Sequence, residues 1–505
     1  MHQDHPDIEK LPLEIDGIPV RETIREIFRN PENGTPDNIN KAGCLALAKQ
    51  GAIFWNAWRA VFPVIQILKA TYPAQYRNRA DFSSQNFQGI LRDLQNFDFG
   101  NRANFDQSVW GALTKFDGAK WGDYSSFFGA VWGDHCNFES AQWGRLCRFD
   151  GAVWGKLTKF SSAKWGSNCM FNEARWGMFS SFAHANLGGW LNFKNCVFEH
   201  DAEFDFSCFG KDVRFTGTIF EGSVRFSSSH NADTFSSIDF SGCEFKNEAD
   251  FGGRKFCGKT NFGLTHESNK KLSLLRDEKG LIVYREDNEF PRFYETNFDR
   301  RPVIFHKQPN FHGCEIHQNT SFEGAKFPEP TGTEEAARAY RTLKLAFSKQ
   351  QAVREEQRFF RLEMAEETMG YRNKAKQALR EFELLKGLRE GFTWVLYKAY
   401  SMLSDYGFSV ARPLVLLVAA WLVFAAIYGS HSNGQTICMV WMAGCELQIN
   451  WLNFSLQQAF PLPGLDKLDH PIKGVAVGWL FLHKTISLAA LFLIGLALRN
   501  LFKLK

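Results

Sequence analysis

Two ionisable residues interrupt an apolar stretch near the end of the chain. His483 and Lys484 lie within residues 474–498, which otherwise hold apolar and small residues. Ionisable groups inside hydrocarbon are costly, and those that occur there commonly serve proton or ion movement. The alternative is that Lys484 extends its stem until the ammonium group reaches the membrane interface. Both residues are therefore candidates for a site within a membrane.

A second set of candidates lies in the preceding segment, NWLNFSLQQAFPLPGLD. This amphipathic run ends at two prolines. Two apolar helices joined by a semi-apolar loop resemble the layout of two-helix channel subunits, whose loop dips back to line a pore. The resemblance implies these pore-side candidates: Phe454, Gln457, Gln458, Pro461 and Pro463. The filter sequence TVGYG of potassium channels is absent, so potassium selectivity has no support.

Two apolar segments predict helices that cross a bilayer, which makes lipid an expected partner. Residues 413–430 and 474–498 approach or exceed the ~20 residues that a hydrocarbon core requires. A buried helical hairpin in a soluble domain is the alternative. Basic residues flank the outer ends of this pair: Arg389, Lys398, Arg412, Arg499, Lys503 and Lys505. The rule that positive charge stays inside places both termini in the cytoplasm and the loop 431–473 outside.

The outer loop contains two cysteines, Cys438 and Cys445. In an oxidising compartment such as a bacterial periplasm, they could form a disulfide. Two unpaired thiols are the alternative.

Most of the chain carries a repeat. Phe and Trp each recur with a period of eleven, offset by five or six residues, at Phe105, Trp110, Phe116, Trp121, Phe127, Trp132, Phe138, Trp143, Phe149, Trp154, Phe160, Trp165, Phe171 and Trp176. This spacing matches neither a helix nor a simple strand, so each unit must turn a corner. A small residue stands two positions before each ring. Rings and small residues should therefore fill a common interior, with about 22 residues in each four-sided coil.

The repeat also predicts roles for its glycines and cysteines. Glycine follows Trp from Gly111 to Gly177, where we expect a positive φ or an outward bulge. Cysteines take the small inward position, where a thiol behaves as a small hydrophobe: Cys136, Cys147, Cys169, Cys196, Cys243 and Cys314. Metal binding is not expected there.

The units RANFD, GAKWG, GAVWG and SAKWG resemble pentapeptide repeats. That family implies a right-handed quadrilateral β-helix. The extra residue in every second unit departs from the family pattern. The order of the whole chain resembles bacterial membrane-bound pentapeptide-repeat proteins, which implies a multi-pass protein of the bacterial inner membrane.

The expected organisation has six parts. They are a helical capping region (1–95), a β-helix (96–263), a looped insertion (264–292), further coils beginning near Phe293 (293–329), a linker of two amphipathic helices (333–410) and a transmembrane hairpin (411–505).

Composition narrows the function. We find no nucleophile–base pair, phosphate-binding loop or metal-spaced cluster, so neither an enzyme nor a cofactor is expected. The net charge of +4 gives no reason to expect nucleic acid. Two hypotheses remain: a membrane-anchored scaffold or sensor whose β-helix binds a cytoplasmic protein, and an oligomeric ion channel gated by that β-helix. A two-helix subunit needs several copies to enclose a pore, so we expect a homo-oligomer.

Overall fold

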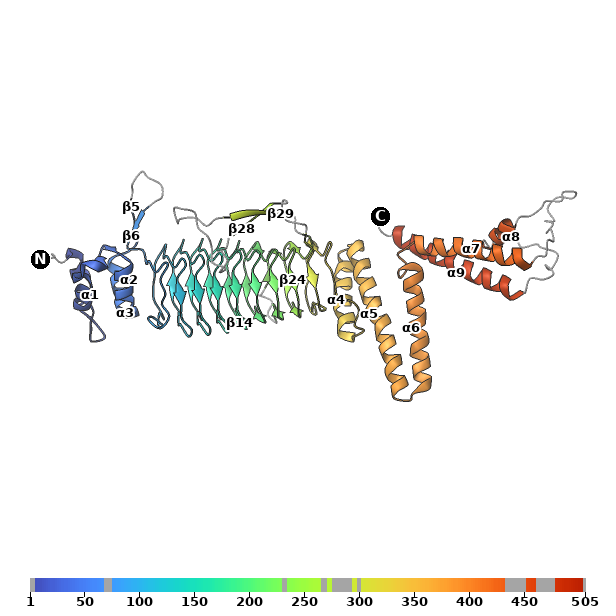
Figure 1. The fold of residues 1–505 in the computed structure, drawn as a ribbon, viewed down its shortest axis with the longest axis horizontal. Coiled ribbons are helices and arrows are strands. Elements are labelled where there is room, and N and C mark those ends of the chain that lie inside the picture. The colour runs from blue at the N-terminus through green and yellow to red at the C-terminus, as the bar shows by residue number, and fades with distance from the viewer. Residues whose placement is uncertain are drawn as a thin grey trace. The chain divides into compact units, whose positions relative to one another are not determined.

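The computed structural model describes residues 5–67, 75–228, 234–264, 270–274, 293–297, 301–431, 451–459 and 477–502. The chain divides into two compact units, Met1–Glu329 and Pro330–Lys505, which are described separately (Figure 1).

The first unit is a β-solenoid of about seven turns, built from four parallel sheets. One long sheet contains β8 (Lys120–Trp121), β10 (Gln142–Trp143), β12 (Lys164–Trp165), β15 (Asn186–Leu187), β18 (Cys208–Phe209), β22 (Thr234–Phe235) and β26 (Lys255–Phe256). The second long sheet contains β7 (Val109–Trp110), β9 (Val131–Trp132), β11 (Val153–Trp154), β13 (Arg175–Trp176), β16 (Val197–Phe198), β20 (Ile219–Phe220), β24 (Glu244–Phe245) and β30 (Ile304–Phe305).

Two shorter sheets complete the four sides. One contains β14 (Ser180–Ser181), β17 (Ala202–Glu203), β21 (Val224–Arg225) and β25 (Ala249–Asp250). The other contains β19 (Val213–Arg214), β23 (Ile238–Asp239), β27 (Thr260–Asn261) and β31 (Thr320–Ser321). Strand pairing confirms the 22-residue coil, because Trp143 pairs with both Trp121 and Trp165.

Aromatic ladders fill the solenoid, as the repeat predicts. The Phe127 and Phe149 rings are stacked with centroids 4.6 Å apart. The indoles of Trp132 and Trp154 are 5.1 Å apart and nearly parallel, at 4°. The small inward residues are buried, and so are five of the six predicted inward cysteines, whereas Cys314 is half-buried. The ladders therefore form a continuous core along the solenoid.

The positive φ that was one expected reason for the Trp-Gly pair is not found. Glycines 111 to 177 of these pairs do not have positive φ; the residues two positions later do, as at Leu113 and Leu157. The glycines instead permit close approach between coils. A Cβ on Gly155 would lie 2.5 Å from the carbonyl carbon of Gly133 in the coil before it.

Arg254 departs from the small-residue rule. It stands two residues before Phe256 and is fully buried. Its guanidinium donates to the carbonyls of Ser207 (2.7 Å) and Phe204 (3.0 Å). The coil at this level is longer, because Phe209 pairs with Phe235 across 26 positions. The long side chain fills the extra room and satisfies main-chain carbonyls.

The solenoid begins earlier than the predicted boundary at residue 96. Its first parallel bridge joins Asp81 to Asn104, and Phe82 and Phe87 already point inward. Their coil precedes the regular Phe and Trp alternation, which is why the period alone misses it.

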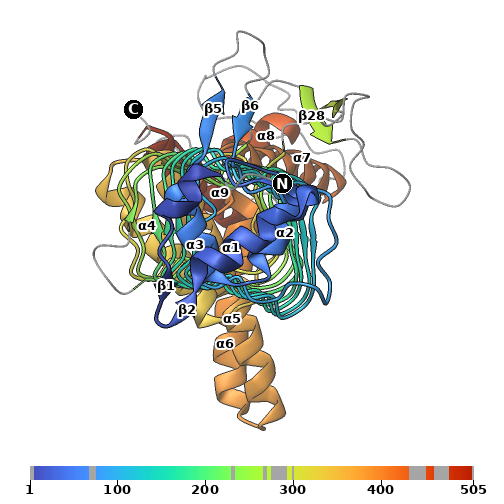
Figure 2. The same cartoon turned by 90° about the vertical axis from the view of Figure 1, so that its left-hand side faces the viewer.

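Short helices cover the first end of the coils, as expected (Figure 2). The Trp55 ring of α3 lies 5.7 Å from Phe82 and 5.8 Å from Phe97. This cap comprises η1 (Pro6–Lys10), β1 (Glu14–Ile15), β2 (Ile18–Pro19), α1 (Val20–Arg29), η2 (Pro31–Asn33), β3 (Gly34–Thr35), β4 (Asn38–Ile39), α2 (Lys41–Ala48), α3 (Ala52–Val61), β5 (Ile65–Ile67) and β6 (Gln75–Arg77). It protects the otherwise open edge of the solenoid.

The insertion contains a β-hairpin, and the coils resume after it. Strands β28 (Lys270–Leu274) and β29 (Phe293–Asn297) pair antiparallel. Phe293 is therefore not part of a coil, contrary to the prediction. Ile304 then pairs with Glu244, so the last coil stacks directly on the coil that precedes the insertion.

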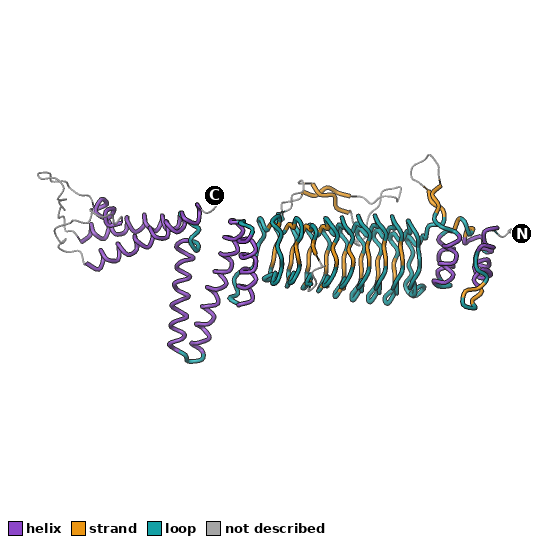
Figure 3. The backbone as a smooth tube through the Cα atoms, turned by 180° about the vertical axis from the view of Figure 1, so that it is seen from behind, coloured by secondary structure: helices purple, strands orange, loops and turns teal. Residues whose placement is uncertain are grey.

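The second unit is helical (Figure 3). The linker has three helices rather than two, α4 (Glu334–Lys349), α5 (Val353–Arg380) and α6 (Leu384–Ser404). The remaining helices are α7 (Ala411–His431), α8 (Trp451–Ala459) and α9 (Val477–Phe502). Residues Ala411–Ser430 and Gly478–Phe502 are long and apolar enough to cross a membrane.

Candidate functional site: a helix folded back between two apolar helices

Helix α8 lies against both apolar helices rather than outside their ends. Phe454 packs in a buried cluster with Ala420, Phe424 and Tyr428 of α7. One turn later, Ala459 packs with Leu417 of α7 and Ala490 of α9. Leu417 is 13 residues from Ser430, or about 20 Å along a helix that is about 30 Å long. Helix α8 therefore reaches deep into the apolar segment.

Hydrogen bonds fix α8 to α7. The Ser455 Oγ donates to the main-chain carbonyl of Trp421 at 2.7 Å. The Trp421 indole Nε1 donates to the carbonyl of Leu452 at 2.8 Å. In an apolar surrounding these polar groups must find partners within the protein. The two bonds thus hold α8 at one position along α7.

His483 lies in an aromatic box beside α8. Its ring stacks on Phe424 at 4.3 Å, and its Nδ1 is 3.1 Å from the Tyr428 hydroxyl. The imidazole is fully buried. Within the described residues, His483 Nε2 and Ser487 Oγ have no hydrogen-bond partner. Because residues four apart share a helix face, two polar groups of α9 point into this interior together.

The structure brings together part of the predicted site. Phe454 and His483 belong to one cluster, Gln458 is buried on α8 and Lys484 is half-buried on α9. The side chain of Gln457 and residues Pro461, Pro463, Cys438 and Cys445 lie outside the described part of the chain.

Sequence reasoning missed the partners on α7, Trp421 and Tyr428, and the buried serines Ser455 and Ser487. Phe424 and Tyr428 are four residues apart, as are His483 and Ser487, and this matched spacing was a usable signal.

A network of hydrogen bonds joins the linker helices to the apolar helices. The turn after α6 contains Gly407, whose carbonyl accepts from Asn500 of α9 at 2.8 Å. The Asn500 carbonyl accepts from Gln357 of α5 at 3.2 Å. Arg361 of α5 pairs with Asp405 at 3.1 Å. Helix α5 is therefore bonded both to the end of α9 and to the turn that precedes α7.

The solenoid carries exposed apolar side chains along two of its corners. They stand two residues after six of the eight Trp-Gly or Leu-Gly pairs and share positive φ and exposed fractions of 38–58%: Leu113, Tyr124, Leu146, Leu157, Phe179 and Trp190. Most corresponding residues at the other corners are small or polar, as at Gly129, Ser140 and Ser162; Phe206 is an exception. A bulky side chain at positive φ costs about 1–2 kcal/mol. These residues form two apolar ridges, one interrupted by His135 and the other by Asn168.

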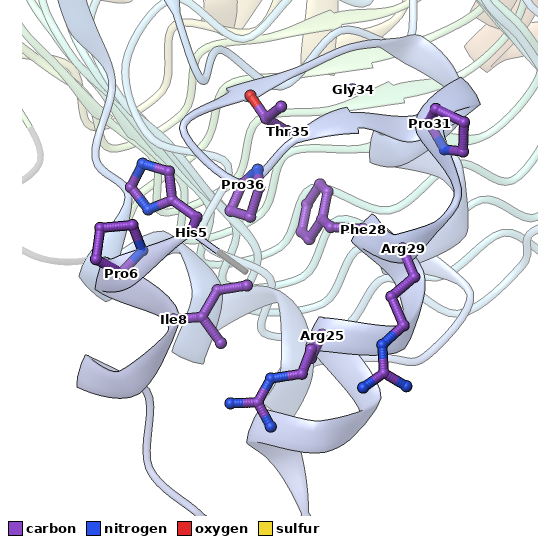
Figure 4. Close-up of a pocket in the computed structure, with 10 residues that line it drawn as sticks. All are labelled: His5, Pro6, Ile8, Arg25, Phe28, Arg29, Pro31, Gly34, Thr35 and Pro36. Carbon is purple, nitrogen blue, oxygen red and sulfur yellow. The ribbon is translucent and has the colours of Figure 1, made fainter. Parts of the chain in front are cut away.

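A cavity of about 370 Å³ lies in the N-terminal cap (Figure 4). Phe28, Pro36 and Ile8 line it, with Arg25 and Arg29 at one side. Both guanidinium groups pair with Glu22, at 2.6 Å and 3.3 Å. Each guanidinium group already has a carboxylate partner, so the cavity does not by itself indicate an anion site.

Among the described residues, no group of three or more His, Cys, Asp or Glu side chains is placed to hold a metal ion. Comparison with protein-family models, curated proteins and solved structures finds no significant match. The fold therefore defines a class, a β-solenoid joined to two apolar helices that fit a membrane anchor.

Proposed function

We propose that the chain is a non-enzymatic subunit of an oligomeric ion channel of the bacterial inner membrane, in which α8 is the re-entrant helix. One observation carries the proposal: Ala459, at the end of α8, packs against Leu417, about two thirds of the way along α7 from Ser430, and against Ala490 in the middle of α9. A plain two-helix anchor needs no third helix at that depth. Several copies around an axis would place several α8 helices about a shared pore.

The orientation of α8, with its C-terminal end deepest, predicts a pore that selects cations. A helix carries partial negative charge at its C-terminal end, where carbonyl groups lack intrahelical partners. In α8 that end is Ala459, the deepest part of the helix. Converging α8 helices would present this charge to ions in the pore.

The proposed orientation places both termini and the solenoid in the cytoplasm, since basic residues flank the outer ends of the apolar pair. The bonded turn around Gly407 offers a route for gating. Force on α5 would reach α9 through Gln357 and Asn500.

Planar-bilayer recording of the purified full chain tests this proposal. With a potassium chloride gradient, we expect stepwise currents whose reversal potential lies toward that of the cation. Anion selectivity would contradict the dipole argument, and an absence of currents would contradict the channel.

A second function is favoured by the apolar ridges of the solenoid. Exposed apolar side chains in strained positions indicate a surface kept for binding, as a scaffold would need. Replacing Tyr124, Leu146 and Trp190 by Ser should remove a cytoplasmic protein partner in pull-downs from detergent extracts. Replacing Ser140 and Ser162 by Ala is the matched control. Equal capture by both variants would count against a scaffold.

A further inference from the structure

Helix α6 exposes an apolar face along its whole length. The exposed fractions are 85% for Leu385, 67% for Leu388, 65% for Phe392 and 53% for Leu396. With 3.6 residues per turn, these side chains share one side of the helix with Leu384, Val395, Ala399, Met402 and Leu403. A contiguous face of this kind is unusual on a protein surface that remains in water.

The opposite face of α6 packs against α5. Gly387, Glu390 and Ser404 are buried, and the Tyr397 ring lies 5.1 Å from Tyr371 of α5. The apolar face therefore points away from α5. Nothing within the described part of the chain covers it.

Basic residues border the apolar face. Arg389 lies next to one edge of the face, where it pairs with Glu390 at 2.8 Å, and Lys398 lies next to the other edge; both basic side chains are exposed. Long cationic side chains at the edges of an apolar stripe can place their charge among lipid headgroups while their stems cover apolar surface. Anionic lipids add attraction for such charges.

The end of α6 is fixed at the level where the apolar helices end. Arg412, in the first turn of α7, donates to the Ser401 carbonyl of α6 at 2.9 Å. Gly407, three residues after α6, accepts from Asn500 near the end of α9. From this point α6 runs crosswise to α7 and α9, on the side of α5 that faces them (Figures 1 and 3).

We propose that α6 lies on the membrane surface, with the face from Leu385 to Met402 buried at the interface between headgroups and acyl chains. The inference rests on the proposed insertion of α7 and α9, and it adds a third membrane contact. Lipid is the occupant because the face is continuous with two helices that themselves require lipid. Helix α6 then keeps the hairpin of α5 and α6 parallel to the bilayer and converts tilting of α5 into movement at Gly407.

Photo-crosslinking to lipid tests the inference in the full chain. The protein is reconstituted in vesicles of zwitterionic and anionic lipid, with a trace lipid that carries a diazirine near the glycerol end of one acyl chain. Mass spectrometry then maps adducts to peptides. We expect adducts on α6, α7 and α9 and few on the charged surface of α5 around Arg372 and Lys376.

Two variants distinguish lipid contact through the apolar face of α6 from unspecific labelling of exposed leucines. The double substitution Leu388→Gln and Phe392→Gln should reduce α6 adducts severalfold and leave those on α7 and α9 unchanged. Leu345→Gln alters a leucine of α4 that is 53% exposed, and it should change nothing. Adducts on α7 and α9 without adducts on α6 would overturn this inference alone. A lack of adducts on all three helices would overturn the proposed membrane function as well.

Discussion

The Ser455 hydroxyl donates a 2.7 Å hydrogen bond to the main-chain carbonyl of Trp421, across 34 positions of the chain. That carbonyl belongs to the middle of α7, so the bond ties α8 to the interior of the apolar helix pair. The position of α8 is the feature that distinguishes this unit from a plain anchor.

Substitution of Ser455 by Ala should weaken the attachment of α8. Hydrogen bonds between membrane helices contribute about 0.6 kcal/mol on average and up to about 1.7 kcal/mol. We expect a small fall in the thermal unfolding midpoint of the detergent-solubilised protein. Ser430→Ala is the control, because the Ser430 hydroxyl donates to the Ile427 carbonyl of its own helix at 2.9 Å. Equal shifts for both variants would mean that the bond to Trp421 contributes nothing.

Glycines at the Trp-Gly corners should differ in their tolerance of Ala. A Cβ on Gly155 would lie 2.5 Å from backbone of the neighbouring coil, whereas a Cβ on Gly111 would lie 3.3 Å from the Cα of Gln88. Backbone cannot move aside cheaply, so Gly155→Ala should lower the denaturant midpoint of the solenoid far more than Gly111→Ala. The circular dichroism signal of the full chain reports both transitions. A larger effect at Gly111 would contradict the close-approach explanation.

The buried indole N–H groups of the ladder predict that replacing a core Trp by Phe will cost much less stability than replacing it by Ala. Trp154 Nε1 is buried and has no hydrogen-bond partner among the residues that the structure describes. Trp154→Ala should cost about 3–5 kcal/mol through the cavity that it leaves. Trp154→Phe should cost much less, because it retains a ring and removes an unpaired donor. Trp190, half exposed on a ridge, should tolerate Ala. Chemical denaturation measures all three, and a Phe variant as damaging as the Ala variant would show that the indole is required.

Cysteine alkylation should follow burial and pH. Burial raises the pKa of Cys136 to about 11 and that of Cys44 to about 12, so these thiols remain protonated and shielded at pH 7–9. Exposed Cys208 and Cys257 should react readily with iodoacetamide, because the reagent can reach them. Peptide mass spectrometry distinguishes the sites. Rapid labelling of Cys136 in the folded protein would contradict a closed core.

The sequence predicts the solenoid well because one inward position is filled again and again by the same residue types. Phe127 and Trp132 indicate their neighbours 22 residues away without any knowledge of the fold. The role of Gly155 is mispredicted because distances between coils are not visible within one repeat. The attachment of α8 is also hidden. Residues such as Ser455 and Trp421 lie far apart in the chain, and no periodicity links them.

Single-channel recording with an altered α8 tests the central claim most directly. Ala459 is fully buried between Leu417 and Ala490, so Ala459→Trp should force α8 out of its position. Phe492→Trp places the same side chain at an exposed position of α9 and is the control. We predict stepwise cation currents from the unaltered protein and from Phe492→Trp, and none from Ala459→Trp at equal incorporation. Silence of the unaltered protein across voltage and membrane tension, or unchanged currents from Ala459→Trp, would contradict a pore built on α8.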